Sequence, residues 1–222
     1  MTRAERDLKY EEYLRGHSGS DPRILSYDSL LREASSRRVR VLGGYSGLGY
    51  QDPAAVRHHV EDIVRKNGDR ALYVIGGTKD GIGEAYEWIR TSAREAGFSD
   101  VRTAGIVSRE AALYPDGIAK QDYLVFVDAD VGVWEVKQDG VSLMVDIAEK
   151  TGGEMIFFKG GAIAGVEIQE ALARGVHVTI YASSDIQPNR ERLAKKRRQD
   201  PNTIADGTAA IVGTRHPFLA VL

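Results

Sequence analysis

The chain of 222 residues contains no cysteine and carries little net charge. The absence of cysteine excludes disulfide bonds, zinc sites built on thiolates and a cysteine nucleophile. The 30 basic and 32 acidic residues leave a formal net charge of -2, so the average field of the protein does not recruit nucleic acid. Nucleic acid is therefore not expected as a partner.

Long apolar runs are also missing. No run approaches the roughly 20 apolar residues that span a bilayer. Residues 1–22 are polar and charged and lack the apolar core of a secretion signal. We therefore expect a cytoplasmic protein that does not enter a membrane.

What the chain does contain is a regular alternation of short apolar runs and helical patterns. Residues 52–68 show the second kind clearly: Asp52 is a suitable N-cap, Pro53 suits the first helical position, and Gly68 ends the pattern. Further helices are predicted within 27–36, 83–97, 142–153 and 164–175. Strands are predicted within 38–44, 70–77, 101–107, 122–130, 154–161 and 176–183, with another possible strand at 133–138.

This alternation predicts an α/β fold. Strands separated by helical patterns of about 10–15 residues form right-handed βαβ units and a mainly parallel sheet. Because the strands are apolar nearly throughout, helices should cover both faces, which makes the sheet doubly wound. We expect a polar or helical extension at 1–37, a ligand-binding domain at 38–185, and a basic helix with an apolar end at 186–222.

Three glycine pairs occupy equivalent places, each after a predicted strand and before a helix. In a parallel sheet these places share the edge where ligands of open α/β sheets bind. Glycine lets backbone N–H groups approach an anion, and a helix N-terminus adds partial positive charge, so a nucleotide-type ligand is favoured over tight turns alone. The candidate binding residues are Gly43, Gly44, Ser46, Gly76, Gly77, Thr78, Lys79, Gly81, Gly83, Gly160 and Gly161.

The common nucleotide fingerprints are absent from these loops. No stretch matches G-x-x-x-x-G-K-[ST], which excludes a P-loop at the level of the motif. The first loop, GGYSGLG, lacks the spacing of G-x-G-x-x-G, and no acidic residue stands at the end of the second strand, where it would hold a ribose in the usual dinucleotide manner. A hydride-transferring dehydrogenase is therefore not favoured.

The order of the loops resembles the SLOG superfamily, over roughly residues 38–182. The resemblance lies in VRVLGGYSGLGYQDP, then YVIGGTKDGIGEA, then FFKGGAIAGVEIQEAL. It implies a Rossmann-like sheet that binds a nucleotide at the glycine loops. The superfamily includes cytokinin-activating phosphoribohydrolases, often misannotated as lysine decarboxylases, the DNA-processing Smf/DprA proteins and several nucleotide sensors.

The chain departs from the hydrolase branch at two places. In the third loop, Gly160, Gly161 and Glu167 match PGGxGTxxE, but Lys159 replaces the proline and Ile163-Ala164 replaces the Gly-Thr that would contact phosphate. The hydrolases also use an arginine on the preceding helix, and residues 142–153 contain only Lys150 as a cation.

Two glutamates are the candidate catalytic residues. A carboxylate beside a sugar can stabilise an oxocarbenium-like centre and activate water, as cleavage of an N-glycosidic bond requires. Glu167 follows the third glycine pair, and Glu170 lies three residues further on the same helical face. The alternatives are that Glu167 only interacts with a helix N-terminus, and that the protein is a nucleotide sensor or accessory subunit without activity.

Asp128 and Asp130 suggest a different chemistry. They end an apolar strand and alternate onto one side of it, as in the DxD motif of metal-dependent nucleotide-sugar transferases. Two carboxylates at this spacing suit Mg²⁺ or Mn²⁺. This transferase is an alternative, whereas the leading hypothesis requires no cofactor.

The remaining segments give weaker predictions. The basic run at 190–198 is expected to be a solvated surface helix, although it has the charge to contact phosphate. The apolar C-terminus would pack on the body or on a second copy in a homodimer. Trp88 and Trp134 have apolar neighbours in the sequence, and both are expected to be packing residues.

Overall fold

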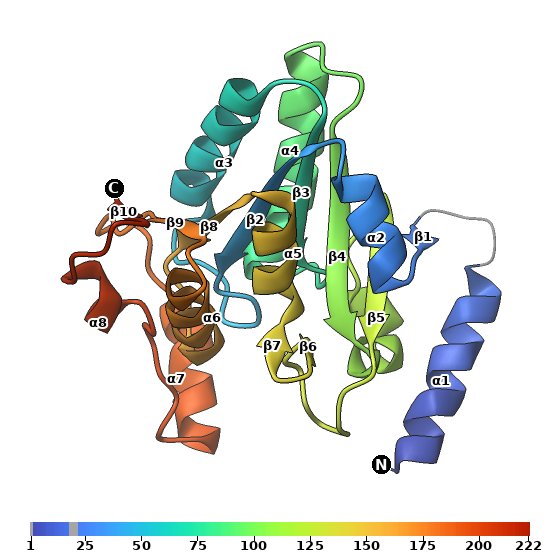
Figure 1. Ribbon diagram of the computed structural model, residues 1–222. Coiled ribbons are helices and arrows are strands. Elements are labelled where there is room, and N and C mark those ends of the chain that lie inside the picture. The colour runs from blue at the N-terminus through green and yellow to red at the C-terminus, as the bar shows by residue number, and fades with distance from the viewer. Residues whose placement is uncertain (1, 18–21) are drawn as a thin grey trace.

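A central parallel sheet organises the computed structural model, which describes residues 2–17 and 22–222. The sheet has eight strands in the order β1-β5-β4-β3-β2-β8-β9-β10, and every neighbouring pair is parallel (Figure 1). The predicted α/β class is confirmed. The strands are β1 (Arg23–Ile24), β2 (Arg38–Gly44), β3 (Ala71–Gly76), β4 (Arg102–Ser108), β5 (Tyr123–Val127), β8 (Glu154–Phe158), β9 (His177–Ile180) and β10 (Leu219–Val221).

Helices cover both faces of this sheet. They are α1 (Arg3–Gly16), α2 (Tyr27–Ala34), α3 (Pro53–Asn67), α4 (Ala85–Glu95), α5 (Leu143–Thr151), α6 (Ala162–Ala173), α7 (Arg190–Gln199) and α8 (Ala209–Val212), with the short 3₁₀ turns η1 (Gly81–Glu84), η2 (Arg109–Leu113) and η3 (Pro115–Gly117). Helices α2, α5 and α6 pack on one face, and α3 and α4 pack on the other. The predicted helix at 52–68 is confirmed, because the Asp52 side chain accepts a 3.0 Å hydrogen bond from the Ala54 amide and Gly68 ends the helix.

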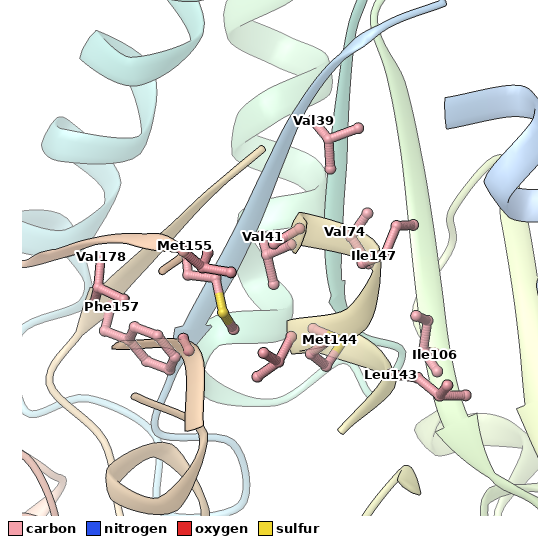
Figure 2. Close-up of a cluster of buried hydrophobic side chains, with 14 of the residues drawn as sticks. Val39, Val41, Val74, Ile106, Leu143, Met144, Ile147, Met155, Phe157 and Val178 are labelled. Carbon is pink, nitrogen blue, oxygen red and sulfur yellow. The ribbon is translucent and has the colours of Figure 1, made fainter. Parts of the chain in front are cut away.

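Side-chain alternation along the central strands builds the two cores. On β2, Val39 and Val41 join the core under α5, whereas Leu42 joins the core under α3 and α4. Figure 2 shows the first of these cores, in which Met144 and Ile147 of α5 lie over strand residues such as Val41. Burial on both faces explains why the strands are apolar nearly throughout.

The order of the strands creates a reversal at the centre of the sheet. From β2 the chain moves outward through β3, β4 and β5, and then returns to the other side of β2 to form β8, β9 and β10. The reversal lies between β2 and β8. In open parallel sheets a crevice forms at this point, beyond the carboxyl ends of the strands.

The terminal segments attach to the same body. Strand β1, within the predicted extension at 1–37, pairs with β5 at one edge, and β10 pairs with β9 at the other. The possible strand at 133–138 is only β6 (Lys137–Gln138), which forms a small antiparallel hairpin with β7 (Val141–Ser142). Among the described residues, none of the helices has the length and apolar character needed to cross a membrane.

Candidate functional site

A cleft of about 420 Å³ opens at the carboxyl ends of the central strands. It spans the reversal between β2 and β8, so its position follows from the topology of the sheet. The loops after β2 and β3, the end of β4, residues 134–136, the start of α6 and the segment that follows α7 all contribute to its walls. The volume is within the range of small-molecule sites, roughly 300–1,000 Å³.

The cleft gathers most of the predicted binding residues, although not all of them. The predicted residues that line it are Gly43, Gly44, Ser46, Gly76, Gly77, Thr78, Gly161 and Glu167. Lys79, Gly81, Gly83, Gly160 and Glu170 are not among its lining residues. Lys79 is exposed, and its backbone amide donates to Gly117 at 2.9 Å.

Several of the loop glycines are required by packing within the chain. A Cβ on Gly43 would collide with the ring of Phe157, and one on Gly44 would collide with the hydroxyl of Tyr50. A Cβ on Gly83 would collide with the backbone carbonyl of Thr78. Gly77, Gly81 and Gly160 are similarly crowded. Tight packing therefore explains these positions without a ligand.

Gly47, Gly76 and Gly161 differ from the other loop glycines. Nothing lies within 4 Å of a Cβ built on Gly47 or Gly76, and the nearest atom to one on Gly161 is the Ile204 carbonyl oxygen at 3.7 Å. None of the three has a positive φ. All three line the cleft, so neither packing nor backbone conformation requires glycine there. Close approach of a ligand to the backbone remains as a physical reason.

Glu167 is the acidic group of the cleft whose pKa is strongly shifted. Burial raises its pKa to about 7; the carboxylates of Glu170 and Glu135 act in the same direction, and Ser142 and Lys137 act against it. The Ser142 hydroxyl donates a 2.8 Å hydrogen bond to Glu167 Oε1. Near neutral pH Glu167 can thus either give or take a proton.

Glu170 has a structural position instead. Its Oε1 accepts a 3.1 Å hydrogen bond from the Ser142 backbone amide. Ser142 is the N-cap of α5, and its hydroxyl also accepts from the Met144 amide at 3.3 Å. Glu170 therefore holds Ser142 in place, and Glu167 is the member of the predicted pair that faces the cleft.

Asp128 is surrounded by arginines. Its carboxylate lies 2.8 Å from Arg3, 2.8 Å from Arg6 and 3.3 Å from Arg109. Partial burial raises the pKa of Asp128, but these cations have the larger combined effect and lower it. A metal ion at Asp128 would have to displace the three guanidinium groups.

Asp130, the second residue of the DxD motif, is exposed. Within residues 2–17 and 22–222, no group of three or more His, Cys, Asp or Glu side chains is arranged to hold a metal ion. The geometry thus gives the metal alternative no support, and Asp128 instead attaches α1 to the end of β5.

Sequence reasoning missed part of the cleft wall. Trp134 is 46% exposed and lines the cleft, so the expectation of a packing residue is wrong for it, whereas Trp88 is buried as expected. Lys196 of α7 is the only basic side chain among the described residues that line the cleft. The basic run at 190–198 can be recognised in the sequence, but its position against the first glycine loop cannot. That position depends on long-range contacts such as the 3.2 Å hydrogen bond that the Asn189 amide donates to the Gly49 carbonyl.

The comparisons with known proteins assign no family. No protein-family model and no curated protein matches the chain. Among solved structures, the chain is similar to the molybdenum cofactor carrier protein MCP from Chlamydomonas reinhardtii, at 12% identity over 83% of this chain and 89% of that one, with a TM-score of 0.45. A second structure of the Moco carrier protein from the same organism has 16% identity, 79% and 93% coverage and a TM-score of 0.43.

Proposed function

We propose that the cleft binds a nucleotide or a related phosphorylated nucleoside and that Glu167 hydrolyses its N-glycosidic bond. The observation that carries the proposal is the group of three cleft glycines, Gly47, Gly76 and Gly161, at which the fold tolerates a side chain. Backbone amides at such positions can approach phosphate oxygens closely. Membership of the SLOG superfamily is part of this proposal.

The start of α6 supports an anionic ligand. Its N-cap is Gly161, which offers no side-chain oxygen to the first free amides of the helix, and its first turn contains no acidic residue. Those amides and the helix dipole favour a phosphate at this end. Lys196 adds a positive charge to the same cleft.

The reaction would use Glu167 as an acid and base. The bond between C1′ and the base nitrogen breaks, and a bond between C1′ and a water oxygen forms. The Glu167 carboxylate accepts the proton that this water loses and then delivers it to the departing base. A pKa of about 7 lets one carboxyl group serve in both directions near neutral pH.

Binding without turnover is the second candidate, and one observation favours it. Lys150, the only cation of α5, is at the last turn of the helix and lies 2.7 Å from Asp146. No basic side chain of α5 therefore replaces the arginine that the resemblance to the hydrolases would require. Such a protein would be a nucleotide sensor or an accessory subunit.

The test combines binding and turnover. Nucleoside mono-, di- and triphosphates, with and without Mg²⁺, are screened by thermal shift and calorimetry, and release of free base is followed by chromatography. We expect magnesium-independent binding, and base release that Glu167→Gln abolishes while binding persists. Binding without base release in the natural chain would support the second candidate. The absence of binding across the panel would contradict both.

The assembly and location of the protein stay proposals as well. A cytoplasmic homodimer is expected, with the apolar C-terminus as a contact surface. Sedimentation at several protein concentrations would measure its mass in solution, and a purely monomeric mass would contradict the dimer.

A further inference from the structure

Apolar side chains are exposed around the mouth of the cleft. Trp134 is 46% exposed, Ile163 47% and Ile204 52%, and all three line the cleft. They come from three separate parts of the chain: the loop before β6, the start of α6 and the segment after α7. Large apolar side chains gathered at a concave surface mark a binding site rather than a packed interior.

The loop that carries Trp134 is fixed on both sides of this residue. Before it, the Gly132 amide donates a 2.9 Å hydrogen bond to the buried carboxylate of Glu110. After it, the Leu143 amide donates to the Val136 carbonyl at 2.8 Å. The indole itself stacks on Tyr114, with ring centroids 6.1 Å apart and an interplanar angle of 29°.

Helix α1 adds a further attachment to this loop. The guanidinium of Arg6, whose side chain is fully buried, donates to the Ala129 carbonyl and, at 2.8 Å, to the Asp128 carboxylate. The exposed indole is thus presented by an anchored loop, and little conformational freedom is lost when a ligand stacks on it.

We propose that Trp134 is a stacking platform for the heteroaromatic base of the ligand, with Ile163 and Ile204 completing an apolar subsite. The inference rests on the proposed function, because the ligand that carries the ring is the nucleotide whose phosphate binds the glycine loops. Every base offers a π-face to an aromatic side chain, so the platform selects for a ring and not for one particular base.

The position of Trp134 in the cleft agrees with the proposed reaction. Its neighbours Glu135 and Val136 line a small recess together with Ser142 and Glu167. A base on Trp134 would therefore direct its glycosidic bond toward the group proposed to cleave it. The phosphate would extend toward Gly76 and Gly161 in the remainder of the same cleft.

Calorimetry with a matched pair of ligands tests the subsite. Adenosine 5′-monophosphate carries both base and phosphate, whereas ribose 5-phosphate lacks the base. We expect Trp134→Leu to weaken binding of the former by roughly 5- to 100-fold and to leave binding of the latter unchanged. Trp134→Phe should restore part of the affinity. Val133→Ala, at an exposed residue of the same loop that does not line the cleft, is the control and should bind both ligands as the natural chain does.

Fluorescence provides a second measurement on a chain with one tryptophan. In Trp88→Phe, the signal comes from Trp134 alone. Adenosine 5′-monophosphate and free adenine should quench it and shield it from acrylamide, and ribose 5-phosphate should do neither.

Equal affinity of Trp134→Leu and the natural chain for the nucleotide would overturn the ring subsite while the proposed function stands. Quenching by adenine without any binding of phosphorylated compounds would support the subsite and overturn the nucleotide assignment. The absence of both quenching and binding would overturn the two together.

Discussion

The hydroxyl of Ser142 donates a 2.8 Å hydrogen bond to Glu167 Oε1 and so joins the N-terminus of α5 to α6. This contact stabilises the charged form of a carboxylate that burial and two neighbouring glutamates disfavour. The pKa of Glu167 still lies at about 7, well above its ordinary value of 4.5. Glu167 is therefore a group whose charge can change near neutral pH, and this has consequences for stability as well as for activity.

The first prediction concerns the dependence of stability on pH. Between pH 4.5 and about 7 the folded protein holds a proton on Glu167 that the unfolded chain releases, so the contribution of Glu167 to stability falls as the pH rises through this window. Because a glutamine side chain does not ionise, Glu167→Gln abolishes this pH-dependent decrease in stability. The free energy of unfolding of the variant, relative to the natural chain, should rise by about 3 kcal/mol from the acidic to the alkaline end of the window. Urea denaturation of both proteins at the two pH values measures the change. A difference in unfolding free energy that is the same at both pH values would contradict a raised pKa of Glu167.

The second prediction distinguishes a glycine required by packing within the chain from a glycine required by close approach of a ligand. Gly76→Ala places its methyl group in open space within the cleft, so the fold should be unaffected or slightly more stable, by up to about 1 kcal/mol. The same methyl group should weaken nucleotide binding by roughly tenfold, because the backbone can no longer contact the phosphate closely. Gly213→Ala is the matched control, since its methyl group also meets nothing within 4 Å but lies outside the cleft. Equal affinities of the two variants would argue that Gly76 does not face the ligand.

The third prediction concerns the basic helix α7. Lys196 lines the cleft and its neighbour Lys195 does not, although both are exposed. Lys196→Ala should therefore weaken binding of phosphorylated ligands by about 3- to 10-fold, and the loss should shrink at high salt because the interaction is exposed. Lys195→Ala should leave the affinity unchanged. Calorimetric titration at low and high salt distinguishes the two variants; an equal effect of both would indicate only a general field of the helix.

The fourth prediction concerns the attachment of α1. Arg6→Ala leaves Asp128 without one of its three cations and removes the donor to the Ala129 carbonyl. We expect a loss of about 2 kcal/mol at neutral pH, below the usual value for a buried ion pair because Asp128 is about one third exposed. The interaction with Asp128 lowers the pKa of that carboxyl, so its contribution is present above the ordinary pKa of aspartate and is lost as the pH falls through the lowered value.

Lys9→Ala is the control for this variant, because Lys9 pairs with Glu12 on the exposed side of the same helix. It should change stability by less than about 0.5 kcal/mol. Amide hydrogen exchange in α1 and in the loop around Trp134 should accelerate in Arg6→Ala and not in Lys9→Ala. Unchanged exchange in the loop would show that α1 does not hold Trp134 in place.

The regular elements were predictable because their signals are local. The strand at 38–44 follows from a short apolar run in which Val41 and Leu42 are buried on opposite faces of the sheet, and the helix at 52–68 follows from the N-cap Asp52 and from Gly68, which adopts a φ of 65°. The glycine pairs were also correctly placed at or just after the ends of β2, β3 and β8. The turn that follows a buried strand depends mainly on the residues at that turn, so its position can be read from the local sequence.

Contacts between distant segments decided the rest. The amino-acid sequence by itself determined the α/β class and the position of the glycine pairs after strands of the sheet. Only the tertiary structure showed that Tyr50 occupies the space beside Gly44, whereas the space beside Gly76 is empty. It also showed that Asp128 forms an ion pair with an arginine 122 residues away, and that Trp134 is exposed beside the cleft. The physical reason is that the burial and ion pairing of a side chain depend on which distant segments contact it. Those contacts are determined by the packing of the whole chain, and the pattern of one segment does not reveal them.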